Sequence, residues 1–118
     1  MKIRIKGNSI RYRLTRPEVE GFNEQKAIIE TVDFGSQILT YGLIITNDIE
    51  FSATYVDHTI MVHFPLVLLN EWKSTEKVGY KAESGMISIL IEKDFTCLDN
   101  VEEDQSENYP NPLPTVKL

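Results

Sequence analysis

The amino-acid sequence predicts an α+β fold of about eight antiparallel strands, in a strongly twisted sheet or a partly closed barrel, with two short helices. Three observations lead to this fold class. Apolar residues recur at every second position in most segments, pairs containing Gly, Asn or Asp separate these segments, and only two stretches carry helix-starting signals. With 118 residues, 42% of them hydrophobic, the chain is expected to form one domain over residues 1–118 without an internal repeat.

The first two strands are expected to form a hairpin. Residues 2–6 and 9–14 alternate cationic with apolar side chains. The Gly7-Asn8 pair between them suits a two-residue turn, because glycine accepts a positive φ. This register places Arg4 opposite Arg11, so that like charges face each other across the strands.

Two helices follow from sequence signals at their first residues. Thr15 with Glu18 three positions later forms a capping box, which predicts a short helix that ends near Glu24. Pro65 can open a second helix over residues 66–73, where apolar side chains recur at three-residue spacing.

The remaining strands are predicted over residues 27–33 and 37–46, on both sides of a turn at 57–58, and over 77–82 and 86–92. Turns at 47–48 and 57–58 predict a three-stranded meander. Its register places Ile44 beside Phe51 and Tyr55 beside Ile60, which makes one face of the meander apolar.

The composition changes from Cys97 onward. Residues 99–108 are acidic and polar, and Pro110, Pro112 and Pro114 alternate with other residues, which excludes a helix there. We interpret residues 97–118 as an acidic, proline-rich C-terminal tail that packs on the sheet.

Charge is distributed very unevenly along the chain. The formal net charge is −6, which disfavours nucleic acid as a partner. Residues 1–16 carry six cations and no acid, whereas residues 92–107 carry seven acids and one lysine. The two ends of the chain therefore have opposite charge.

The sequence also bears on location. No apolar stretch approaches the length of about 20 residues that a membrane-spanning helix needs, so no membrane association is expected. The alternating first residues do not resemble a secretory signal, and Cys97 is the only cysteine, which excludes an intrachain disulfide. A cytoplasmic location is the expectation.

The basic hairpin is the most unusual local feature, because like charges directly across a strand pair destabilise it. Three interpretations stay open. The cations pair with acids of the same fold, including the acidic tail; they are simply solvated; or Arg4, Arg11 and Arg13 form an anion-binding face for phosphate or carboxylate groups.

No catalytic residue and no cofactor can be assigned. His58, His63 and Cys97 are the only soft metal ligands, and their spacing does not indicate a metal site. Acidic neighbours would raise the pKa of the Cys97 thiol, which indicates an inert cysteine. Whether the protein is an enzyme stays open, since no phosphate-binding loop or catalytic triad is recognisable.

Three segments, residues 2–11, 92–98 and 103–112, resemble a family of short bacterial proteins from Bacteroidetes-type genomes that is known only as a domain of unknown function. The resemblance implies that the whole chain is the family domain and that the tail belongs to it. It implies no activity, ligand or catalytic residue.

We therefore expect a small cytoplasmic binding or interaction domain without catalysis, whose basic hairpin is paired to acidic groups. The alternative is an anion- or polyphosphate-binding enzyme of tunnel-like architecture. Such tunnels resemble one another through alternating glutamates in the first strand, where this chain has Lys2, Arg4 and Lys6. A homodimer that buries a face with Met61 and Tyr41 is a further possibility.

Overall fold

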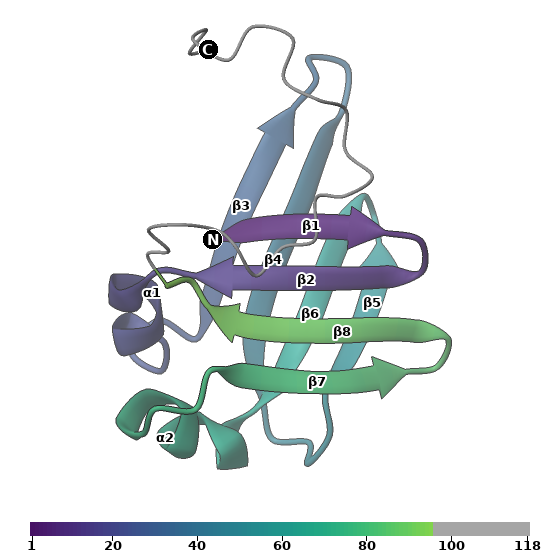
Figure 1. Cartoon of the computed structure of the whole chain (residues 1–118). Helices are drawn as coiled ribbons and strands as arrows, with labels where there is room; N and C mark the ends of the chain where they lie inside the picture. The colour runs from purple at the N-terminus through teal and green to yellow at the C-terminus, as the bar shows by residue number, and fades with distance from the viewer. Residues whose placement is uncertain (96–118) are drawn as a thin grey trace, which may run out of the picture.

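The computed structural model describes residues 1–95 and contains eight strands and two helices in these residues. The strands form four hairpins, and one helix follows the first hairpin and another the third (Figure 1). In chain order the elements are β1 (Lys2–Lys6), β2 (Ser9–Leu14), α1 (Arg16–Gly21), β3 (Ala27–Asp33), β4 (Ile38–Thr46), β5 (Ser52–Val56), β6 (Thr59–Pro65), α2 (Leu66–Ser74), β7 (Gly79–Ser84) and β8 (Ile87–Lys93).

The strands form two separate four-stranded sheets, with the orders β1-β2-β8-β7 and β3-β4-β6-β5. Figure 1 shows that the strands of one sheet cross those of the other. Each sheet is mixed, because β2 pairs with β8 and β4 with β6 in parallel, while the outer pairs are antiparallel. The α+β class is confirmed, but the expected all-antiparallel sheet or partly closed barrel is wrong.

The topology is repeated although the sequence shows no repeat. The order strand, strand, helix, strand, strand occurs in β1 to β4 and again in β5 to β8. In both halves the helix starts directly after the second strand, and the hairpin before it joins a different sheet from the hairpin after it. Each sheet is therefore built from one hairpin of each half.

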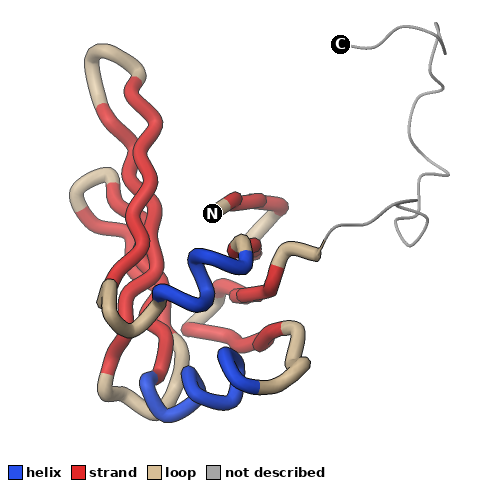
Figure 2. Tube along the Cα trace, turned by 90° about the vertical axis from the view of Figure 1, so that its left-hand side faces the viewer, coloured by secondary structure: helices blue, strands red, loops and turns tan. Residues whose placement is uncertain are grey.

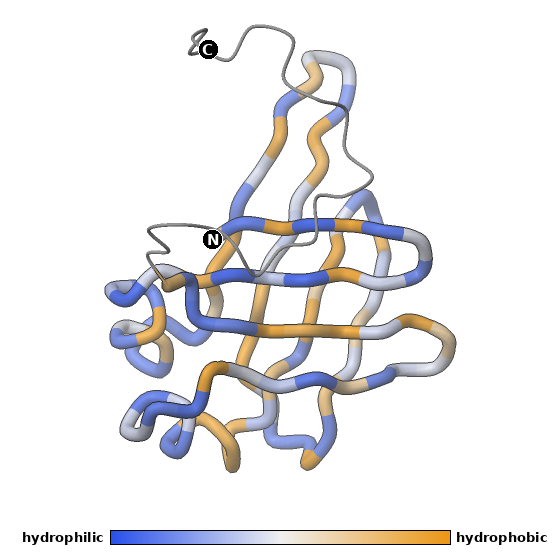
Figure 3. Tube along the Cα trace, viewed as in Figure 1, coloured by the Kyte–Doolittle hydropathy of each residue, from blue (hydrophilic) through white to orange (hydrophobic). Residues whose placement is uncertain are grey.

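The core lies between the two sheets and is closed at one end by both helices (Figure 2). Hydropathy alternates along most strands, as Figure 3 shows, so one side chain in two points inward. Fully buried residues come from both sheets and both helical segments, and among the largest are Tyr12, Phe22, Phe64 and Trp72. Phe64 lies at the centre of an aromatic cluster with Phe22, Phe51, Trp72 and Tyr80.

Local signals predicted several elements correctly. The first hairpin has the expected register, with Arg4 opposite Arg11. The capping box is present, since the Thr15 side chain accepts from the Glu18 N–H and the Glu18 carboxylate accepts from the Thr15 N–H. The first helix ends at Gly21, earlier than predicted.

The predicted three-stranded meander is wrong in one of its two pairings. Tyr55 faces Ile60 as expected, because β5 and β6 form the hairpin about residues 57–58. Ile44 does not pair with Phe51. It pairs with His63, since β4 lies parallel to β6.

Among the described residues, no helix is long and apolar enough to cross a membrane. The tail of residues 97–118, which was expected to pack on the sheet, lies outside the described residues.

Candidate functional site

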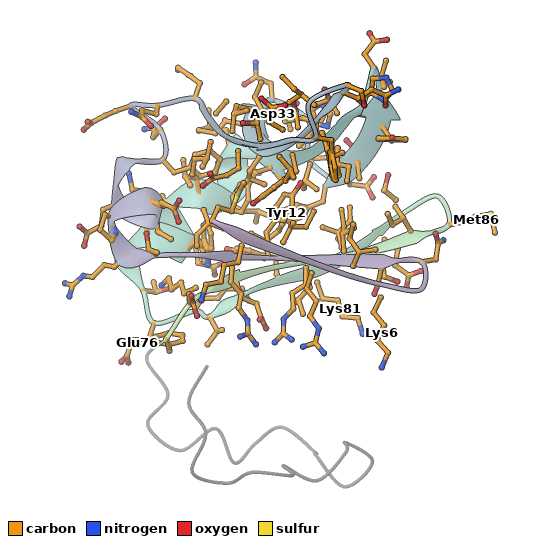
Figure 4. All side chains as sticks on the ribbon, turned by 90° about the horizontal axis from the view of Figure 1, so that it is seen from above. Lys6, Tyr12, Asp33, Glu76, Lys81 and Met86 are labelled. Carbon is orange, nitrogen blue, oxygen red and sulfur yellow. The ribbon has the colours of Figure 1, made fainter. Side chains whose placement is uncertain are left out.

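The outer face of the β1-β2-β8-β7 sheet gathers most of the cations of the first strands. On β1 and β2 the apolar side chains point to the core, so the intervening residues point outward. We call the six cations on this side the basic face: Lys2, Arg4, Lys6, Arg11, Arg13 and Lys81. Figure 4 shows Lys6 and Lys81 directed away from the second sheet, whereas Tyr12 lies between the sheets.

Three of these cations form ion pairs with two acids near the end of β8. Arg11 directs both its Nε and Nη2 to Oε1 of Glu92, each at 2.8 Å. Arg13 Nε lies 3.7 Å from the same oxygen, and Lys2 Nζ lies 3.2 Å from Oδ2 of Asp94. The N-terminal hairpin is thus salt-bridged to acidic residues from the C-terminal part of the described chain.

The other three cations, Arg4, Lys6 and Lys81, have no carboxylate within ion-pair distance among residues 1–95. Arg4 lies opposite Arg11, which in turn neighbours Leu90, and Leu90 faces Lys81. Neighbouring strands are about 4.8 Å apart, so this row places cations over about 14 Å of the sheet.

An open hollow of about 450 Å³ follows this row of side chains. Its lining includes the cations Arg4, Lys6, Arg11 and Lys81 and the hydroxyl-bearing residues Ser9 and Ser88. Guanidinium and ammonium groups donate hydrogen bonds and accept none, so the hollow is suited to an anion with many oxygen acceptors. A smaller hollow of about 180 Å³ continues toward Lys2 and Arg13.

The structure places the three predicted site residues on one sheet face, but only two of them line the 450 Å³ hollow. Arg4 and Arg11 line the large hollow, while Arg13 lies outside it and shares Glu92 with Arg11. Sequence reasoning missed Lys81 as part of this face. Its alternation with Tyr80 and Ala82 indicates an outward direction, but only the parallel pairing of β2 with β8 brings it near Arg11.

The other chemical candidates do not form a site in the described part of the chain. His58 lies in the β5–β6 turn and has a positive φ of 59°, whereas His63 lies near the far end of β6. No group of three metal-ligating side chains occurs among residues 1–95. Cys97 lies outside the described residues.

The face proposed for a homodimer from Met61 and Tyr41 does not exist as one surface. The Tyr41 ring lies 6.3 Å from that of Tyr12 in the interior. Met61 flanks Gly42 on the opposite side of the β3-β4-β6-β5 sheet. Met61 pairs with Gly42, the residue after Tyr41. Successive residues of a strand point to opposite faces of the sheet, so Met61 and Tyr41 lie on opposite faces.

A second charged cluster supports the beginning of β1. The Met1 ammonium donates to Glu18 Oε2 at 2.6 Å and to Glu30 Oε2 at 3.2 Å. Burial raises the pKa of the Glu18 carboxyl, but hydrogen bonds from the Met1 ammonium and Thr15 outweigh burial and lower it overall. Burial lowers the pKa of the Met1 amine, and its bonds to Glu18 and Glu30 outweigh this and raise it.

Replacement of Glu18 with glutamine should lower the free energy of unfolding at pH 7 by about 1–2 kcal/mol, because it removes the capping-box carboxylate and an ion pair. A carboxyl with a lowered folded-state pKa stabilises the fold above its unfolded pKa and loses that effect as the pH falls. The difference from wild type in urea unfolding should therefore shrink at acidic pH. Glu20→Gln on the exposed side of α1 is the control, and an equal effect there would contradict the prediction.

Comparisons with known proteins give one match. The model of a family described as a family of unknown function, DUF7009, matches residues 1–113. No curated protein and no solved structure matches the chain.

Proposed function

Because the chain belongs to DUF7009, a family of unknown function, we propose a function from the basic face itself: a non-catalytic interaction domain that binds a carboxylate-rich polypeptide segment. The observation that carries this proposal is the set of three cations, Arg4, Lys6 and Lys81, that share one hollow and have no acidic partner among residues 1–95. A cytoplasmic setting is part of the proposal, supported by the single cysteine.

The contacts already present support carboxylate as the ligand group. Glu92 accepts a hydrogen bond from Arg11 Nε and forms an ion pair with its Nη2, and Asp94 pairs with Lys2. Arginine recognises planar carboxylates through its fork of donors, and a row of cations over about 14 Å suits an extended segment better than a single small ion. The exposed position on a sheet face favours association and exchange over an enclosed reaction site.

The alternative, a polyphosphate enzyme with a tunnel, loses its architectural basis. The two sheets do not close into a barrel, and the space between them is filled by hydrophobic side chains such as Tyr12, Leu43 and Phe64. The cations lie on the outside of one sheet instead. A phosphate-bearing ligand on this outer face is distinguished from a peptide in the experiment below.

The test measures binding of a fluorescein-labelled peptide of about ten Glu and Asp residues by fluorescence anisotropy at low ionic strength. The host, which we call the tail-neutralised chain, is the full chain with the five acids of residues 99–107 replaced by amides, so that these acids do not compete with the peptide. Its substitutions are Asp99→Asn, Glu102→Gln, Glu103→Gln, Asp104→Asn and Glu107→Gln. Exposed ion pairs contribute about 0.2–1 kcal/mol each, so the variant Arg4→Gln, Lys6→Gln, Lys81→Gln should weaken binding about tenfold.

The matched control removes three exposed cations elsewhere, with Arg16→Gln, Lys26→Gln and Lys77→Gln. This control changes the net charge equally and should retain nearly all of the binding. Equal losses in both variants, or no binding by the host, would reject the proposal. Binding of Mg²⁺-tripolyphosphate with release of phosphate would instead support the enzyme alternative.

A further inference from the structure

We propose that the acidic segment 99–107 of the same chain occupies the basic face and competes there with a partner's carboxylates. This inference rests on the proposed function, since it names what regulates access to the same face. Three observations carry it: where the described chain ends, how far the segment can reach, and which charges it would meet.

The chain leaves the described part of the domain at the border of the basic face. After β8, the Asp94 N–H donates to the Leu14 carbonyl at 2.8 Å, which holds this segment beside the end of β2. The Asp94 carboxylate lies 3.2 Å from Lys2 Nζ. An acid of the departing chain is thus already paired with the first cation of the face.

The next cations lie within reach of the acidic segment. Lys2 and Lys6 are the two ends of β1, and four strand intervals separate them by about 13 Å. Asp99 follows Asp94 by five residues, and an extended chain covers about 3.3 Å or slightly more per residue, or about 17 Å here. Residues 99–107 can therefore pass over Arg4 and Lys6 and extend toward Lys81.

The charges of the two parts are complementary. Residues 99–107 contain five acids and no cation. The part of the face that they would meet contains the three cations that have no acidic partner among residues 1–95. A tethered segment of this length has a local concentration in the millimolar range, so individually weak ion pairs suffice for its occupancy. Such pairing is screened by salt.

The test compares the full wild-type chain with the tail-neutralised chain defined above. We expect the tail-neutralised chain to bind the labelled acidic peptide about tenfold more tightly, with a difference that narrows as salt is added. A matched control neutralises five exposed acids elsewhere, with Glu24→Gln, Asp48→Asn, Glu50→Gln, Asp57→Asn and Glu76→Gln. This control has the same net charge as the tail-neutralised chain and should bind the peptide as weakly as wild type does.

A second measurement detects the tail on the face without any added peptide. A nitroxide at position 106, attached through Ser106→Cys in a Cys97→Ser chain, should broaden the amide NMR signals of Arg4, Lys6 and Lys81. The broadening should decrease in the variant Arg4→Gln, Lys6→Gln, Lys81→Gln and persist in the variant Arg16→Gln, Lys26→Gln, Lys77→Gln.

The outcomes separate the two proposals. If the tail-neutralised chain binds the peptide no more tightly than wild type, or if the nitroxide broadens no signals of the basic face, occupancy by the tail is rejected while the proposed function stands. If the tail-neutralised chain binds no acidic peptide at all, the proposed function is rejected.

Discussion

Replacement of Trp72 with alanine is expected to lower the free energy of unfolding by about 3–5 kcal/mol, the range for deletion of a buried large aromatic side chain. Trp72 is fully buried where α2 closes the end of the two sheets. Its ring stacks on Phe64 with centroids 5.1 Å apart, and its indole N–H donates to the Val78 carbonyl at 3.0 Å. Urea-induced unfolding followed by circular dichroism measures the loss.

Val67→Ala provides the control in the same helix. The Val67 side chain is 68% exposed, and alanine has the higher helix propensity, so this variant should change stability by less than about 0.5 kcal/mol. Similar losses in the two variants would contradict the role of α2 as the cover of the core.

Replacement of Gly79 with alanine should have the second large effect, a loss of about 2–3 kcal/mol. A Cβ at this position would lie 1.9 Å from the Ile91 carbonyl oxygen and 2.9 Å from the Glu92 Cα. Both are backbone atoms of the neighbouring strand β8, so the start of β7 must move away and lose ladder hydrogen bonds. Thermal unfolding should show a clearly lower Tm.

Gly21→Ala is the matched control, because a Cβ there meets no atom within 4 Å. Gly21 ends α1 without a positive φ, so alanine should raise stability by up to about 1 kcal/mol through helix propensity and a smaller loss of backbone entropy. If both glycine variants were equally stable, the close approach at Gly79 would be refuted.

Hairpins, caps and the direction of side chains could be predicted from the sequence because they depend on residues close together in the chain. The Gly7-Asn8 turn fixes the pairing of Arg4 with Arg11. The capping box at Thr15 fixes the start of α1. In the same way, the Gly85 turn has a positive φ of 60° and joins β7 to β8.

The sheet arrangement could not be predicted, since it depends on pairings between distant segments. The predicted meander joined β4 to β5 because they are consecutive, but β4 instead lies parallel to β6. The apolar pattern of β4 is compatible with either neighbour, since alternation specifies a face and not a partner. Phe51 still contacts Phe64, with ring centroids 5.0 Å apart, although it lies just before β5.

The same limit applies to the candidate site. The crowded cations of the first hairpin could be recognised from sequence, and Glu92 and Asp94 could be named as acids of the opposite end. Their pairing with Arg11 and Lys2, and the approach of Lys81, depend on β8 lying beside β2. Nothing local indicates that contact, because 79 positions separate Ser9 from its partner Ser88.

The exchange of hairpins between the two halves has a consequence for how the protein reaches its native state. Neither half completes a sheet by itself, because each of its hairpins shares a sheet with a hairpin of the other half. The parallel central pairs, β2 with β8 and β4 with β6, join segments that are separated by other elements in the chain. Bringing such segments together costs loop-closure entropy before their contacts can compensate for it. We therefore expect these parallel pairings to slow folding, and unfolding of either half to leave both sheets incomplete.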